Sequence, residues 1–138
     1  MASTRVLVVD DEPGGADLVA ARLERSAVCG EAVATRDPHE ALETVREGAV
    51  DCVVSDYRMP RLDGLELFEA VRESDPELPF VLYTARDDPA FERRATEAGV
   101  TACLRKDGGR DHYRRMVEAI RRATGRSETD AAAPESDR

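Results

Sequence analysis

Apolar and polar positions follow a repeating order along this chain, with short apolar segments separated by longer amphipathic ones. Three of the apolar segments are nearly continuous, which is typical of strands buried on both faces of a parallel sheet. Two others are weaker and indicate short strands or strands at the sheet edges. The predicted strands cover residues 6–9, 32–34, 52–55, 80–83 and 102–104.

The segments between these strands carry apolar residues at helical spacing, and several have a clear helix start. Asp37 is a candidate cap followed by proline, and Pro13 stands at a plausible first position of the first helix. Alternating strands and helices predict an α/β fold with a (βα)5 doubly wound parallel sheet. The pattern alone does not determine the strand order. The predicted helices cover residues 13–25, 37–47, 64–73, 88–98 and 111–123.

The chain has 138 residues, which fits one domain with a single hydrophobic core. We expect that domain to cover residues 1–124, because residues 125–138 lack apolar periodicity and have the composition of a disordered acidic tail. No apolar run approaches the roughly 18 residues of a membrane span. The N-terminus turns acidic too early for a signal peptide. These features predict a cytoplasmic protein that does not enter a membrane.

The formal net charge is −9, and no basic stripe is present that could follow a phosphate backbone, so direct nucleic-acid binding is not expected. Of the 20 basic residues, all but Lys106 are Arg. An ammonium is a compact point charge and guanidinium a wide planar fork, which makes Lys106 a candidate functional residue. Cys29, Cys52 and Cys103 are odd in number and lack metal-ligand spacing, which favours a structural role.

Residue types that can carry chemistry stand at the predicted strand ends. Ligands of open α/β sheets bind at the carboxyl ends of the strands, so these side chains should share one crevice. Each alone has an ordinary explanation, such as helix capping by Asp11 or a turn at Thr84. Their occurrence at four strand ends in order favours one site. The candidates are Asp10 and Asp11 after the first strand, Asp56 after the third, Thr84 after the fourth and Lys106 after the fifth.

Crowded carboxylates repel one another, and the repulsion raises their pKa values unless a cation is present. Oxygen ligands suit Mg²⁺, or Mn²⁺ in its place, which accepts one or two carboxylates together with phosphate oxygens. Such a cation would offset the negative charge of an incoming phosphoryl group. Beside this positive charge, the Asp56 carboxylate can attack phosphorus and form an acyl phosphate. Thr84 and Lys106 are suited to contact the phosphoryl oxygens. The residues therefore predict phosphoryl transfer to an Asp carboxylate.

Four segments make the chain resemble the receiver domain of two-component response regulators over residues 4–123. The second segment is the most specific, because Met59-Pro60 and Asp63-Gly64 follow Asp56 at the family spacing. The resemblance implies a flavodoxin-like sheet with strand order 2-1-3-4-5. The segments are VLVVDDEP (6–13), VVSDYRMPRLDGLEL (53–67), VLYTA (81–85) and TACLRK (101–106).

The resemblance also implies a role for each site residue. Asp56 accepts phosphoryl from the phospho-His of a sensor histidine kinase, Thr84 is the switch hydroxyl, and Lys106 pairs with the phosphoryl oxygens. The implied protein is a signalling domain that catalyses its own phosphorylation and dephosphorylation, not a metabolic enzyme. The implied metal ligands are Asp11, Asp56 and the backbone carbonyl of Arg58, with Asp10 acting through water.

Two positions depart from the family pattern. The aromatic ring that usually stands three residues before the Lys is replaced by Cys103, and a thiol cannot reproduce the volume of a rotating ring. The usual proline after the Lys is replaced by Asp107, followed by two glycines. Receivers of halophilic archaea often have such a glycine-containing segment, and the acidic composition fits that origin.

The family often signals through the face around its fourth helix, fifth strand and fifth helix. In this chain that region is rich in Arg, and we expect it to dock on a downstream protein with an acidic surface, not identified by the sequence. The alternative is that neighbouring Glu side chains balance these Arg residues and the region has no docking role. The predicted docking surface comprises Phe91, Arg93, Arg94, Arg105, Tyr113, Arg114 and Arg115.

Three other functions are compatible with parts of this residue set but fit it less well. An aspartyl phosphatase needs a second acid two residues after the nucleophile, where this chain has Arg58. A flavin site of the same topology would place a phosphate against Asp10 and Asp11, which would repel it. A degenerate receiver that binds protein without phosphorylation usually lacks the acceptor, the Lys or the acidic pair, all of which are present. Cys103 keeps this last alternative open.

Overall fold

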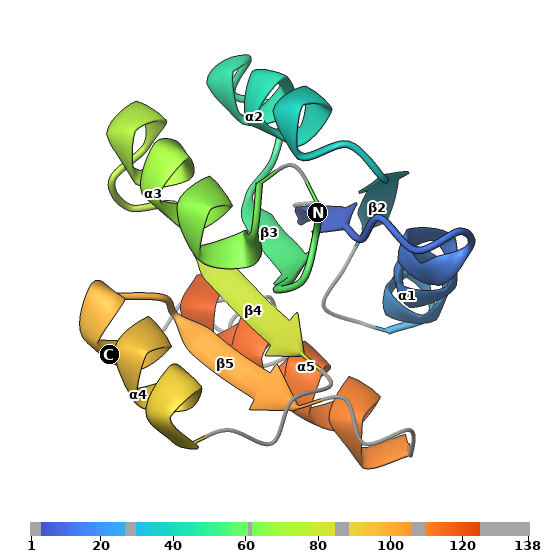
Figure 1. Cartoon of the computed structure of the whole chain (residues 1–138). Coiled ribbons are helices and arrows are strands. Elements are labelled where there is room, and N and C mark those ends of the chain that lie inside the picture. The colour runs from blue at the N-terminus through green and yellow to red at the C-terminus, as the bar shows by residue number, and fades with distance from the viewer. Residues whose placement is uncertain (1–3, 27–29, 61, 85–88, 106–109, 125–138) are drawn as a thin grey trace, which may run out of the picture.

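The computed structural model describes residues 4–26, 30–60, 62–84, 89–105 and 110–124 (Figure 1). The strands of these segments form one parallel sheet in the order β2-β1-β3-β4-β5, which confirms the expected fold class and strand order. They are β1 (Arg5–Val9), β2 (Glu31–Thr35), β3 (Cys52–Asp56), β4 (Phe80–Thr84) and β5 (Ala102–Arg105).

The burial of each strand follows its position in the sheet. The three inner strands β1, β3 and β4 are buried over nearly their whole length, because helices cover both faces of a parallel sheet. The outer strands β2 and β5 are mostly half-buried, as their weaker apolar pattern predicts. The parallel register pairs Val9 with Thr35 and Ser55, and Asp56 with Tyr83. The carboxyl ends of these strands therefore lie at one edge of the sheet.

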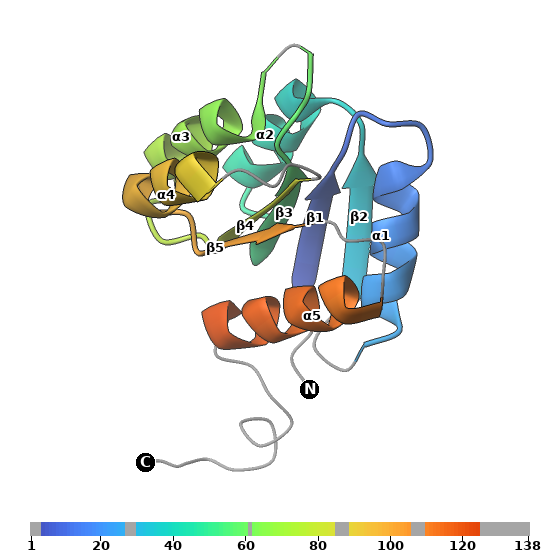
Figure 2. The same cartoon turned by 60° about the horizontal axis from the view of Figure 1, so that its bottom comes forward.

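The helices form a layer on each side of the sheet (Figures 1 and 2). We call the side covered by α1 and α5 the α1/α5 face, and the other side the α2/α3/α4 face. All three Phe side chains of the chain lie on the α2/α3/α4 face, whereas the α1/α5 face is built mainly from Val, Ala and Leu around Tyr83. The helices are α1 (Gly15–Glu24), α2 (Pro38–Arg46), α3 (Gly64–Ser74), α4 (Pro89–Ala98) and α5 (Arg110–Thr124).

The predicted start of the first helix is wrong, whereas the predicted cap of the second helix is confirmed. Helix α1 begins at Gly15, because Gly14 before it has a φ of 78°, in the left-handed region that favours glycine. Pro13 therefore precedes the helix cap. Asp37 caps α2 as expected, since its carboxylate accepts a hydrogen bond from the His39 amide at 2.9 Å.

Helix α3 has a complete capping box at its N-terminus. The Asp63 carboxylate accepts from the Glu66 amide at 2.9 Å, and the Glu66 carboxylate accepts from the Asp63 amide at 2.9 Å. This reciprocal pair satisfies two backbone donors that the helix itself leaves without partners. The capping box fixes the first turn of α3, and the Gly64 amide joins that turn to the end of β3 by donating to the Tyr57 carbonyl at 2.8 Å.

Some expectations concern segments beyond the described residues. The predicted tail at 125–138 and the predicted first residue of the fourth helix, Asp88, are among them. The domain boundary at residue 124 accordingly stays a prediction. In the described parts of the chain, every helix is too short or too polar to cross a membrane.

Candidate functional site

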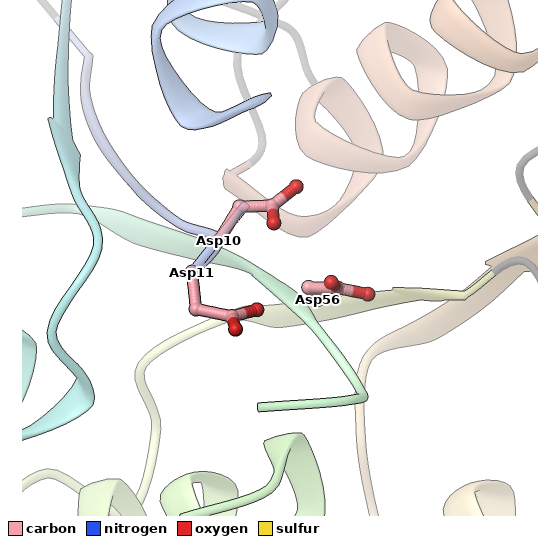
Figure 3. A group of neighbouring side chains, drawn as sticks. All are labelled: Asp10, Asp11 and Asp56. Carbon is pink, nitrogen blue, oxygen red and sulfur yellow. The ribbon is translucent and has the colours of Figure 1, made fainter. Parts of the chain in front are cut away.

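Three carboxylates meet at the carboxyl edge of the sheet (Figure 3). Asp10 directly follows β1, Asp11 comes next, and Asp56 is the last residue of β3. Each of the three offers a carboxylate oxygen, and these oxygens lie within 4.8 Å of one another. The predicted convergence of Asp10, Asp11 and Asp56 is thus present in the fold. We call these three residues the acidic cluster.

Asp10 is the most enclosed member of the acidic cluster, with 2% of its surface exposed. Its Oδ1 accepts a hydrogen bond from the Glu12 amide at 3.0 Å. Its Oδ2 accepts one from the Tyr83 hydroxyl at 2.9 Å. Gly15 at the start of α1 lies against the same carboxylate, where an added Cβ would come within 2.9 Å of Oδ2. Both oxygens of Asp10 are therefore held in place by other parts of the protein.

Asp56 is held at the end of β3 through its backbone and its carboxylate. It is 8% exposed, and its Oδ1 accepts from the Tyr57 amide at 2.8 Å. A Cβ added to Gly64 would come within 2.6 Å of the Asp56 carbonyl oxygen. Helix α3 can therefore pack directly on the backbone of Asp56 only because residue 64 has no side chain. Asp56 keeps a small part of its surface accessible at this edge of the sheet.

Asp11 is the most exposed member of the acidic cluster, and Arg58 follows Asp56 by two positions in the sequence. Asp11 is half-buried, and its backbone carbonyl accepts a hydrogen bond from Nε of Arg36 at 3.1 Å. Arg58, whose carbonyl the resemblance implies as a metal ligand, has an exposed side chain. Three carboxylates within 4.8 Å are hard oxygen ligands and fit Mg²⁺ or Mn²⁺. The donor set of the acidic cluster is therefore compatible with the expected cation.

The remaining predicted site residues lie at the ends of β4 and β5. Thr84 is the last residue of β4, is buried, and pairs with Arg105 of β5 in the sheet register. Lys106 falls outside the described residues, as does Ala85. The expected contact between Lys106 and the phosphoryl position is therefore still a prediction. The strand ends that lead to both residues do reach the same edge as the acidic cluster.

Cys103 occupies the middle of β5 and is half-buried. Burial, and then the negative charge of Glu92, raise the pKa of its thiol to about 11. The thiol is therefore protonated at neutral pH and is a weak nucleophile. It packs beside the α2/α3/α4 face as a small apolar residue, which agrees with the structural role expected from the sequence.

Phe91 does not belong to the predicted docking surface. Its side chain is only 1% exposed, and its ring packs against Tyr57 with the ring centroids 4.1 Å apart. Phe91 and Ala95 are four residues apart on α4, so both point into the α2/α3/α4 face. The Arg members of the predicted docking surface are exposed, and Tyr113 is half-buried. The predicted docking surface therefore consists of exposed Arg side chains and the half-buried Tyr113, without Phe91.

Sequence reasoning missed Tyr83 as a member of the site. Burial, and then the negative charge of Asp10, raise the pKa of the Tyr83 phenol far above its ordinary value. The phenol therefore stays protonated and acts as a donor. A signal was available, because a Tyr in an otherwise apolar buried strand needs a partner for its hydroxyl. The sequence could not say that this partner is Asp10.

Comparisons with a family model and with known proteins all point to the same family. Residues 6–118 match the model of the response regulator receiver domain. The chain is 32% identical over 130 residues to response regulator MprA of Mycobacterium ulcerans, covering 94% of this chain and 55% of that protein. It is 34% identical over 123 residues to the C4-dicarboxylate transport transcriptional regulatory protein DctD of Pseudomonas aeruginosa, covering 88% of this chain and 25% of that protein. The chain thus spans about half or less of these relatives.

Solved structures agree with this match. The signal receiver domain of the putative response regulator NarL from Mycobacterium tuberculosis has a TM-score of 0.74 and 32% identity, covering 91% of this chain and 100% of that one. A response regulator receiver domain protein from Clostridium thermocellum has a TM-score of 0.79 at 23% identity, covering 88% of this chain and 94% of that one, and supports the fold alone. Since the family model covers residues 6–118, the chain belongs to the response regulator receiver domain family, a family of signalling domains.

Proposed function

We propose that this chain accepts a phosphoryl group on Asp56 from the phospho-His of a sensor histidine kinase, and that the modification changes a protein-interaction surface. The observation that carries the proposal is the acidic cluster, whose carboxylate oxygens lie within 4.8 Å of one another at the edge of a receiver fold. Asp10, Asp11, Asp56 and the backbone carbonyl of Arg58 would hold Mg²⁺ or Mn²⁺. A bound cation would offset the negative charge of the incoming phosphoryl group.

In the proposed step, a carboxylate oxygen of Asp56 bonds to phosphorus while the phosphorus–nitrogen bond of the donor breaks. The electron pair of that bond returns to the imidazole nitrogen of the kinase. The Tyr57 amide restricts rotation of the Asp56 carboxylate through the bond to Oδ1, which reduces the entropy lost on reaching the reactive geometry. Thr84 and Lys106 are proposed to contact the phosphoryl oxygens, and water would later remove the group.

The proposed output is contact with a downstream protein partner from the cytoplasm. The exposed Arg side chains on α4, β5 and α5 favour a partner with an acidic surface. The net charge of −9 on the whole chain opposes approach to a nucleic-acid backbone, so we propose that the domain itself acts on protein. Cys103 replaces the aromatic residue expected in β5, so the surface change would not depend on a rotating ring at that position.

The direct test is phosphorylation with acetyl phosphate and Mg²⁺, followed by intact-mass spectrometry. We expect one Mg²⁺-dependent phosphoryl adduct on the wild-type chain and none on Asp56→Asn. Beryllofluoride with Mg²⁺ should shift the backbone amide resonances of the wild-type chain near Thr84 and leave those of Asp56→Asn unchanged. If no adduct and no shift appear with several donors and cations, the chain is a degenerate receiver that binds its partner without phosphorylation.

A further inference from the structure

Tyr83 connects two strands that are not neighbours in the sheet. It lies on β4, which is separated from β1 by β3. Its hydroxyl nevertheless donates a 2.9 Å hydrogen bond to Oδ2 of Asp10, just beyond the end of β1. Both side chains are buried, with Tyr83 1% exposed. A buried bond to a charged acceptor is stronger than an ordinary hydrogen bond, and removing one partner leaves the other unsatisfied.

Tyr83 also contacts the acceptor strand through its backbone. It is the register partner of Asp56 across the β3–β4 pairing. Its carbonyl oxygen accepts from the Tyr57 amide at 3.1 Å, and that amide also donates to Oδ1 of Asp56. The backbone of Tyr83 therefore lies beside Asp56 while its hydroxyl holds Asp10. One residue fixes the spacing of two of the three carboxylates in the acidic cluster.

We propose that Tyr83 is a positioning residue for the divalent cation, which acts by fixing the Asp10 carboxylate in the acidic cluster. The inference rests on the proposed function, because it concerns the cation that the acidic cluster would bind. The Tyr83 hydroxyl stabilises the negative charge of Asp10 next to two other carboxylates, and it selects one rotamer of that side chain. Groups that orient metal ligands in this way strongly influence metal affinity.

Tyr83→Phe removes the hydroxyl and keeps the ring that fills the α1/α5 face. We expect the Kd for Mg²⁺ measured by isothermal titration calorimetry to increase roughly tenfold. At saturating Mg²⁺ the phosphorylation rate with acetyl phosphate should return to the wild-type value, because the chemistry itself does not use Tyr83. A role limited to packing would leave the Kd unchanged. Ser26→Ala removes a hydroxyl beyond the C-terminal end of α1, where it donates to the Leu23 carbonyl at 2.6 Å, and is the control, with an expected wild-type Kd.

Gly15→Ala tests the same oxygen from the opposite side. The added Cβ would come within 2.9 Å of Oδ2 of Asp10 and displace the carboxylate that Tyr83 holds. We expect this variant to fold, since alanine suits the first turn of a helix, and to bind Mg²⁺ more weakly than the wild type. It also provides an independent answer if Tyr83→Phe proves poorly folded by circular dichroism.

The outcomes separate this inference from the proposed function. If the wild type binds Mg²⁺ and is phosphorylated, but Tyr83→Phe keeps the wild-type Kd, then the positioning role is overturned and the receiver function stands. If the wild type binds no divalent cation, the positioning role and the cation-dependent function both fail. A weaker Kd with unchanged maximal rate in the variants supports the positioning role.

Discussion

Helices α1 and α3 both begin with a glycine beside the acidic cluster, but different contacts fix their first turns. The first turn of α3 is held by the Asp63–Glu66 capping box. The first turn of α1 has Gly14 as its cap, with no side-chain capping bond. Gly64 faces the Asp56 backbone, where an added Cβ would lie 2.6 Å from the carbonyl oxygen. At Gly15 the three described atoms nearest to an added Cβ all belong to the Asp10 carboxylate.

The difference indicates separate tasks for the two helices. Backbone atoms cannot move aside without distorting the sheet, so the contact at Gly64 fixes the backbone of the proposed acceptor Asp56 rigidly. The Asp10 carboxylate is part of a side chain and is held by hydrogen bonds, so a Cβ added at residue 15 can be accommodated by displacing that side chain without distorting the sheet. Helix α3 therefore supports the proposed acceptor Asp56, and α1 supports the proposed cation ligand Asp10.

The largest effect is expected from Gly64→Ala. The new methyl group would lie 2.5 Å from Cδ1 of Leu82 as well as against the Asp56 carbonyl. Overpacking of this kind destabilises a folded protein by about 1–3 kcal/mol, which urea unfolding measures. Phosphorylation by acetyl phosphate should slow in parallel, because the backbone of Asp56 must shift. A variant with wild-type stability and wild-type rate would show that the contact at Gly64 is not rigid.

A smaller effect is expected from Asp63→Ala, which removes the side-chain cap of α3. The free energy of unfolding should fall by about 1 kcal/mol, again by urea titration. Glu66→Gln is the control, because glutamine can still return a hydrogen bond to the cap residue, and its stability should stay close to wild type. If Asp63→Ala is as stable as the wild type, the first turn of α3 is fixed by packing and not by the cap.

The smallest change in stability is expected from Gly15→Ala. Displacing the Asp10 carboxylate costs free energy, but alanine is favoured over glycine in a helix by about 1 kcal/mol, so the two terms largely offset each other. Urea unfolding without Mg²⁺ should therefore give a value within about 1 kcal/mol of wild type. A loss as large as that of Gly64→Ala would remove the distinction between the two helix starts.

The sequence predicted the features that depend on local pattern. Continuous apolar runs identified the inner strands, and the acids after the first and third runs identified Asp10, Asp11 and Asp56 as neighbours. The start of α1 was missed because Pro13 is equally suited to precede a glycine cap. Local pattern cannot reveal such a turn, since it depends on a backbone angle that only glycine adopts readily.

The positions of two further side chains were not predicted correctly from the sequence. Phe91 was assigned to the surface from its place in a family interface, although its spacing from Ala95 indicated a buried helix face. Tyr83 was counted as part of an apolar strand, because its partner Asp10 lies 73 residues away in the sequence. Contacts of this separation depend on the strand order, which the apolar pattern did not determine.

The acidic cluster also has a thermodynamic consequence for the whole domain. Three carboxylates held within 4.8 Å repel one another in the native state and are relieved of that repulsion on unfolding. A cation that binds only the native cluster stabilises the fold by RT ln(1 + [L]/Kd), about 2.7 kcal/mol at a concentration one hundred times Kd. The melting temperature of this domain should therefore rise with divalent-cation concentration, and a thermal melt becomes a measurement of site occupancy.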